Sequence, residues 1–153
     1  MPDRGTMKRV KRDVKEGKSA STQAGEFVRE EIEHIREGKH GARSAKQAIA
    51  IGLSKARRAG VKLPPPNPAT TSKQIVRKAR QDSASGSELH QPAKKRSRAT
   101  MAALKRESSG TVSSKALSKQ AYSAASRRTK KERSASAKKA SATRKRQKRT
   151  SNT

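Results

Sequence analysis

The large apolar residues of this chain are concentrated in one short stretch, from Phe27 to Leu63, and this limits what the chain can fold into. Only 29% of the 153 residues are apolar, and Phe27 and Tyr122 are the only aromatic residues. A chain with so few large apolar side chains cannot bury a core along its whole length. We therefore expect a folded part of about the size of this stretch and disorder in most of the remainder when the protein is free.

Residues 21–36 are predicted to form an amphipathic helix. Their apolar residues recur three and four positions apart, which matches one face of a helix. Ser21 or Thr22 is placed to cap the N-terminus, and Gly38 follows the last helical residue.

A second helix is predicted from Ser44 to Ala59. Ser44 is followed three residues later by Gln47, a spacing typical of a capping box, and Gly60 is placed to end the helix in a left-handed conformation. The two helices and the glycine-containing turn between them predict an antiparallel helical hairpin. Its expected core-facing stripe consists of Ala45, Ala48, Ile49, Gly52, Leu53, Ala56, Ala59 and Gly60. Because this stripe is mostly small, another helix can approach closely at Gly52.

The predicted fold class is mainly α, a small helix-turn-helix hairpin with a long disordered basic tail. Five segments are predicted along the chain: a basic N-terminal arm over residues 1–18, a helical hairpin domain over 19–63, a proline-rich linker over 64–71, a weakly helical basic region over 72–126 and a disordered Lys/Arg/Ser/Ala tail over 127–153.

The charge of the chain predicts its class of partner. Forty Lys and Arg residues face twelve acids, a formal net charge of +28, and 24 of the basic residues but only four acids follow Leu63. Between Arg127 and Arg149 there are 12 basic residues and one acid, which exceeds what solubility requires. Such a charge favours binding to a nucleic acid backbone, where neutralised phosphates release condensed counterions.

The predicted nucleic-acid-binding residues lie in the basic arm and in the basic clusters that follow the linker. They are Lys8, Arg9, Lys11, Arg12, Lys94, Lys95, Arg96, Arg98, Arg127, Arg128, Lys130, Lys131, Lys138, Lys139, Arg144, Lys145, Arg146, Lys148 and Arg149.

We expect these residues to bind and compact double-stranded DNA without strong sequence preference. Two aromatic residues provide no stacking platform for single strands, and no zinc-finger, RNP or KH signature is present. Three alternatives remain open: the hairpin is a minimal helix-turn-helix that reads a groove, the protein associates with RNA or ribosomes, or the hairpin binds a protein while the tail tethers it to nucleic acid.

The sequence predicts no enzyme, no cofactor, no metal site and no small-molecule substrate. There is no cysteine, and no Ser/His/Asp set or glycine-rich fingerprint is visible. Glu31 and His34 have the Glu-x-x-His spacing of di-iron bundles, but those sites need two copies and this chain has one. Glu31 projects into the apolar arc of its helix, where a buried carboxylate needs a partner, and His34 or Arg43 is the expected one.

No apolar run reaches the length of a membrane span or a signal-peptide core; the longest is Ala48 to Leu53. We therefore expect a soluble cytoplasmic protein without a membrane partner. A lone hairpin of this size has a marginal core, so we also expect a homo-oligomer, with Ile51 as a candidate contact.

Residues 34–44 and 46–60 resemble a family of small basic bacterial and phage proteins of unknown function, some of which are labelled DNA-binding. Residues 98–106 and 116–121 are similar to the longer members, whose tails resemble the Lys/Ala-rich tails of histone H1-like proteins. The resemblance implies a role at the bacterial nucleoid and supplies no catalytic residue.

Overall fold

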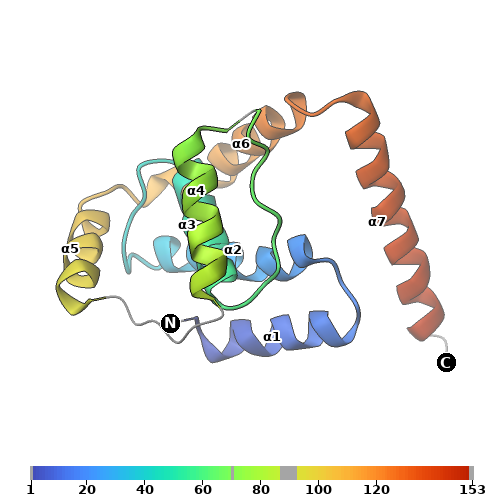
Figure 1. Cartoon of the computed structure of the whole chain (residues 1–153), viewed down its shortest axis with the longest axis horizontal. Coiled ribbons are helices and arrows are strands. Elements are labelled where there is room, and N and C mark those ends of the chain that lie inside the picture. Colours follow the sequence, from blue (N-terminus) through green and yellow to red (C-terminus); the bar gives the residue numbers. More distant parts are fainter. Residues whose placement is uncertain (1, 70, 87–92, 152–153) are drawn as a thin grey trace. The chain divides into compact units, whose positions relative to one another are not determined.

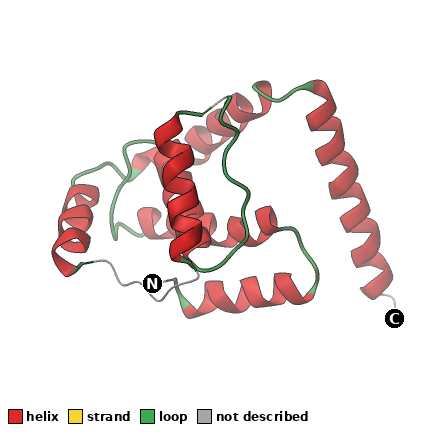
Figure 2. Cartoon of the chain, viewed as in Figure 1, coloured by secondary structure: helices red, strands yellow, loops and turns green. Residues whose placement is uncertain are grey.

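The computed structural model describes residues 2–69, 71–86 and 93–151, without the side chains of residues 150 and 151. These residues form helices and no strand, so the predicted mainly helical class is confirmed (Figure 2). The helices are α1 (Arg4–Lys15), α2 (Ala20–Arg36), α3 (Ala45–Arg58), α4 (Lys73–Ser85), α5 (Lys94–Lys105), the 3₁₀ helix η1 (Gly110–Val112), α6 (Ser114–Ser126) and α7 (Lys130–Ser151) (Figure 1).

The chain divides into two compact units, residues 1–113 and residues 114–153. Parts of four predicted segments lie outside the described residues: residue 1 of the basic arm, residue 70 of the linker, residues 87–92 of the weakly helical region and residues 152–153 of the tail.

Helices α2 and α3 form the predicted hairpin, with ends close to the predicted ones. Ser19, rather than Ser21 or Thr22, caps α2, and its Oγ accepts a hydrogen bond from the Thr22 amide at 3.4 Å. After α2 the backbone of Gly38 is left-handed, with φ of 72°. Helix α2 therefore begins at Ala20, one residue before the start that its apolar pattern predicts.

The cap of α3 follows the prediction with one difference. Ser44 Oγ accepts a hydrogen bond from the Gln47 amide at 3.2 Å, as a capping box requires. The Gln47 side chain reaches back to the amide of Arg43 at 2.6 Å, one residue before the cap. Gly60 has φ of 89° and ends the helix as predicted.

The close approach predicted at Gly52 is present. A Cβ atom at this position would lie 2.6 Å from the Val28 Cα of α2, so the two backbones touch here. Within the predicted stripe, Ala45, Ala48, Gly52 and Ala56 are buried, whereas Gly60 at its end is exposed.

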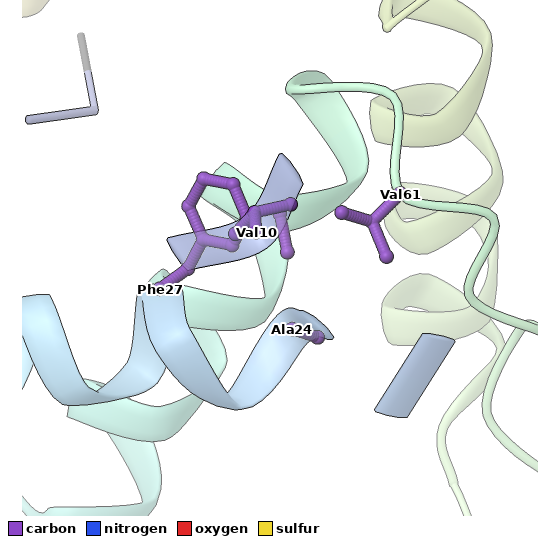
Figure 3. Packing of buried hydrophobic residues seen from close by; sticks show 5 residues of the cluster. Val10, Ala24, Phe27 and Val61 are labelled. Carbon is purple, nitrogen blue, oxygen red and sulfur yellow. The ribbon is translucent and has the colours of Figure 1, made fainter. Parts of the chain in front are cut away.

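Residues 4–15, predicted as part of a basic arm, form helix α1 and contribute to the core. Val10 packs in one buried cluster with Ala24, Phe27, Ala56 and Val61 (Figure 3). Met7, one helical turn before Val10, packs against the same cluster. An apolar pair at this spacing between basic residues gives α1 a narrow apolar face, which is enough to dock it on α2.

A second buried cluster joins the hairpin turn to a distant segment. It consists of Ile35, Ala42, Ala48 and Val112, and Val112 lies in η1. The Arg36 guanidinium donates to the Val112 carbonyl at 3.2 Å, and the Ala42 amide donates to the Ser108 carbonyl at 3.1 Å. The folded part is thus larger than the predicted hairpin domain of residues 19–63.

Helix α4 also packs on the hairpin, by a polar contact with α3. Ser54 Oγ donates to the buried Asp82 carboxylate at 2.7 Å, and Lys78 lies 3.1 Å from the same side chain. Gly86 is in tight contact with the Arg57 carbonyl at the end of α3, where a side chain would not fit.

Residues 114–126, expected to be weakly helical, form helix α6, whereas the tail over residues 127–153 was expected to be disordered and contains helix α7. Between Thr111 and the end of the chain there is no glycine or proline to interrupt a helix, and Ala, Lys, Arg and Gln favour one. Thr129 and Glu132 form a full capping box at the start of α7: Glu132 accepts from the Thr129 amide at 2.8 Å, and Thr129 Oγ1 accepts from the Glu132 amide at 3.2 Å.

Candidate nucleic-acid interface

Helix α7 carries the densest set of basic side chains. It has 22 residues, which corresponds to a length of about 33 Å. Its ten Lys and Arg residues are distributed over about 240° of the helix circumference, at about 100° per residue, and all are exposed. Charges on so much of the circumference do not leave an apolar face that could pack on a protein core.

The only acid of α7, Glu132, is used within the helix. It accepts hydrogen bonds from the backbone and the hydroxyl of Thr129, and these bonds lower the pKa of its carboxyl group below the ordinary value. Residues 114–153 contain 14 basic residues and one acid, a formal charge of +13. This unit therefore presents an almost purely cationic surface.

Helix α5 forms a second basic surface. Lys94, Lys95, Arg96 and Arg98 are all exposed within its first five residues, and the helix has no buried residue. No side chain caps its N-terminus at Ala93. The backbone amides of the first turn therefore add partial positive charge to the same end of the helix.

Helix α1 presents fewer free cations than its sequence suggests. Lys8, Lys11 and Arg12 are exposed, but Arg9 is half-buried and forms an ion pair with Glu26 of α2. The Arg9 charge is thus neutralised within the fold, and Arg12 lies 3.8 Å from Glu16.

Other exposed cations lie outside the dense clusters from which the prediction was made. Among them are Lys73, Arg77 and Arg80 of α4 and Lys115 and Lys119 of α6. Their spacing along the chain is wider than in the clusters, so charge runs alone did not identify them.

The acids of the first unit do not neutralise these surfaces, because they are held in local pairs. Each of the ten acidic residues described between positions 2 and 113 lies within 4.0 Å of a Lys, Arg or His side chain. Several of these pairs shift the pKa of a partner; for example, the Asp13 carboxylate raises the pKa of Lys18, and Arg29 lowers that of Glu33.

Glu31 is buried, as predicted, but its partners are different from the expected ones. Its carboxylate lies 2.6 Å from Lys55 Nζ and 3.3 Å from His40 Nε2, while Arg43 pairs instead with Glu107 at 3.6 Å. Glu30, the residue before Glu31 in α2, is also buried.

In the described part of the chain, no helix combines the length and the hydropathy needed to cross a membrane. A comparison of the sequence with the curated proteins, and another with the solved structures, found no match. Residues 4–67, which include helices α1, α2 and α3, match the model of a family of unknown function, DUF6496.

Proposed function

We propose that the protein binds and compacts double-stranded DNA without sequence specificity, at the bacterial nucleoid, by neutralising phosphates with exposed Lys and Arg side chains. The observation that carries the proposal is α7, a long helix whose basic residues cover most of its circumference and whose single acid is used in its cap. The protein acts in this proposal as a binding protein and not as an enzyme.

The dimensions of α7 support contact with both walls of a DNA groove. An α-helix with its side chains is about 10–12 Å across, and the major groove of B-DNA is about 12 Å wide. Basic residues spread over about 240° of the helix can reach phosphates on both sides of the groove at once. A length of about 33 Å corresponds to about one turn of the duplex.

Compaction requires that one protein, or one oligomer, contacts two DNA segments. The chain carries two sets of exposed cations in separate compact units, on α1, α4 and α5 in one and on α6 and α7 in the other. Each set can neutralise phosphates of a different duplex, so a single chain has the charges needed to bridge two segments. Self-association through the hairpin, which we expect from the sequence, would add to this effect, and sedimentation of the DNA-free protein tests it.

The test is the salt dependence of duplex DNA binding. Six to ten phosphate contacts predict that affinity falls by about 10³ to 10⁵ between 50 and 200 mM salt. In a variant with five cations of α7 changed to Gln, the slope of log affinity against log salt should be less steep by about 4.5. Between 50 and 200 mM salt, the affinity of this variant should therefore fall about 500-fold less than that of the unchanged chain. The five residues are Arg144, Lys145, Arg146, Lys148 and Arg149.

The matched control exchanges Lys for Arg and Arg for Lys at the same five positions. It keeps every charge and should keep the slope, because phosphate neutralisation depends on charge and not on the side-chain type. A slope that is unchanged in the Gln variant would show that these residues of α7 do not neutralise phosphates, and it would contradict the proposal.

Duplex RNA of the same length distinguishes DNA binding from the ribosome-associated alternative. The major groove of an A-form helix is deep and narrow, so α7 cannot enter it as it enters that of B-DNA. Tighter binding to duplex DNA than to duplex RNA at matched salt is expected. The reverse order would favour the RNA-associated alternative.

A further inference from the structure

A largely buried group of carboxylates and histidines lies where the end of α2 meets the turn between α2 and α3. Glu30, Glu31 and His34 come from α2, and His40 comes from the turn between α2 and α3. Glu31 is 0% exposed and His40 is 7% exposed. One ligand atom from each of Glu31, His34 and His40 lies within 4.8 Å of the other two, a spacing that suits a shared metal ion.

The hydrogen bond of His40 fixes which of its nitrogens faces Glu31. Nδ1 lies 3.1 Å from the Gly41 carbonyl oxygen, which can only accept, so Nδ1 carries the proton. In a neutral imidazole Nε2 then presents a lone pair, and it lies 3.3 Å from Glu31 Oε1. Two lone pairs that face each other in a buried site repel one another. The site therefore requires either a cation between them or a second proton on one of the two groups.

The same arrangement is typical of a metal ligand. A histidine that binds a metal usually donates its other ring N–H to a backbone carbonyl or a carboxylate. Two ligand atoms bound to one Zn²⁺ at about 2.0–2.1 Å in tetrahedral geometry are about 3.3 Å apart, which matches the separation of His40 Nε2 and Glu31 Oε1. Glu31 Oε1 has no hydrogen-bond partner among the described residues, so its lone pairs remain available.

Asp3 approaches the group from the solvent side. Its carboxylate lies 3.1 Å from His34 Nε2, and its backbone amide donates to Glu30 Oε2 at 3.1 Å. Asp3, Glu30 and His34 also have ligand atoms within 4.8 Å of one another.

With both histidines neutral, the carboxylates of the group outnumber its cations. Asp3, Glu30 and Glu31 carry three negative charges, and Lys55, which lies 2.6 Å from Glu31 Oε2 and 3.7 Å from Glu30 Oε1, supplies one positive charge. With both histidines neutral, one divalent cation brings the sum to zero. Lys55 contacts Oε2 of Glu31 and leaves Oε1 to the metal, so the lysine and the metal can be present together.

We propose that Glu31, His34 and His40 bind a divalent transition metal, with Zn²⁺ as the ion that best fits two imidazoles and a carboxylate, and that Asp3 closes the site on its solvent side. The site holds the start of α1, the end of α2 and the turn before α3 together, so its role is structural. This inference is independent of the proposed binding to DNA, and it replaces the sequence-based expectation of no metal site.

The test uses the full chain, freed of nucleic acid by nuclease and of metal by chelator, because DNA itself binds divalent ions. Titration with Zn²⁺ at neutral pH should show one ion per chain by calorimetry and a higher unfolding temperature. Co²⁺ in place of Zn²⁺ should give the strong visible absorption of a four-coordinate ion with nitrogen and oxygen ligands.

Histidine variants locate the ion. His34→Gln and His40→Gln should each weaken Zn²⁺ binding by more than about 100-fold. Loss of a residue that only hydrogen-bonds to a metal ligand typically costs 10- to 100-fold in affinity, and loss of a ligand itself should cost more. His90, the third histidine of the chain, lies outside the described residues, and His90→Gln is the matched control that should bind Zn²⁺ as the unchanged chain does. His34 is only partly buried, so its variant should remain folded even if the His40 variant does not.

The imidazole NMR signals of the unchanged chain provide a readout that does not depend on any variant. Zn²⁺ should shift the signals of His34 and His40 at one equivalent and leave that of His90 in place. If no histidine signal responds to Zn²⁺, the metal site is refuted. Equal shifts of all three signals, with no change of affinity in the His34 and His40 variants, would also refute it.

Discussion

Replacement of Gly52 by alanine tests the backbone contact between α2 and α3. The added Cβ would lie 2.6 Å from the Val28 Cα and 2.9 Å from the Val28 amide nitrogen, whereas carbon atoms in contact are normally about 3.5–4.0 Å apart. The obstructing atoms belong to the backbone, so a change of rotamer cannot relieve the overlap, and the helices must separate by about 1 Å.

The expected free-energy change combines two opposing terms. Overpacking of a core typically costs about 1–3 kcal/mol, and a rigid backbone obstacle places Gly52→Ala at the upper end of this range. Alanine gains about 1 kcal/mol over glycine in helix propensity. We expect a net loss of about 2 kcal/mol in the free energy of unfolding of the first unit.

Gly25→Ala is the matched control, because it makes the same chemical change in the neighbouring helix. Gly25 is an exposed residue of α2, and a Cβ there would meet no atom within 4 Å. Only the propensity term remains, so this variant should gain about 0.5–1 kcal/mol. The two substitutions are therefore expected to have opposite signs.

Urea unfolding followed by the amide NMR signals of α2 and α3 measures both variants without interference from the helices of residues 114–151. Comparison of the midpoints at constant slope gives the change in the free energy of unfolding. A Gly52→Ala chain as stable as the Gly25→Ala chain would show that the two backbones are not in contact and would refute the packing argument.

Three further predictions concern polar contacts. Asp82→Ala should detach α4 from α3, because Asp82 accepts the hydrogen bond of Ser54, and a hydrogen bond to a charged group contributes about 1.5–3 kcal/mol; faster amide exchange in α4 without a change in α2 is the expected readout. Thr129→Ala should remove the cap of α7 and cost its helix about 1 kcal/mol, measured as lower helix content by circular dichroism, and unchanged content would contradict this. The raised pKa of Lys18 means that its pairs with Asp13 and Glu16 stabilise the fold fully below the ordinary lysine pKa of 10.5 and are lost as the pH rises through the raised value. Unfolding temperatures are measured from pH 8 upward. Above about pH 10.5, the unfolding temperature should fall less for Lys18→Met than for the unchanged chain. Lys62→Met, at an exposed position, is the control and should follow the unchanged chain.

The sequence predicts the hairpin well because its signals are local. A cap such as Ser44 and a left-handed glycine such as Gly60 act on residues within one helical turn, so they can be identified without knowledge of the fold. The small residue at position 52 also predicts a close helix contact, since large side chains on both sides would keep the helices apart.

Contacts between distant segments could not be predicted in this way. Val112 enters the core 76 residues after Arg36, with which its carbonyl is hydrogen-bonded, and a single valine in a polar segment has no periodicity to identify it. Helix α1 was assigned to an arm because its basic residues outnumber the two apolar ones that dock it.

The partners of the buried Glu31 could not be predicted from the sequence for the same reason. The sequence correctly places Glu31 on the apolar side of its helix and requires a partner for it, but several cations are compatible with that requirement. Lys55 is the partner because α3 runs back along α2, and His40 faces the carboxylate because of the turn geometry. Both depend on the register of the hairpin, which the pattern of apolar residues leaves undetermined.

The ion pairs of the first unit bear on how the salt dependence of DNA binding is interpreted, because salt could weaken the fold as well as the phosphate contacts. The pairs that involve buried partners, such as Lys55 with Glu31 and Lys18 with Asp13, are screened far less by salt than exposed charges are. The remaining pairs are more exposed and contribute little to the stability of the fold. Contacts of exposed lysines and arginines with phosphates depend steeply on salt over the same range. The fold should therefore persist between 50 and 200 mM salt, and the slope measured there reports the number of phosphates that the protein neutralises.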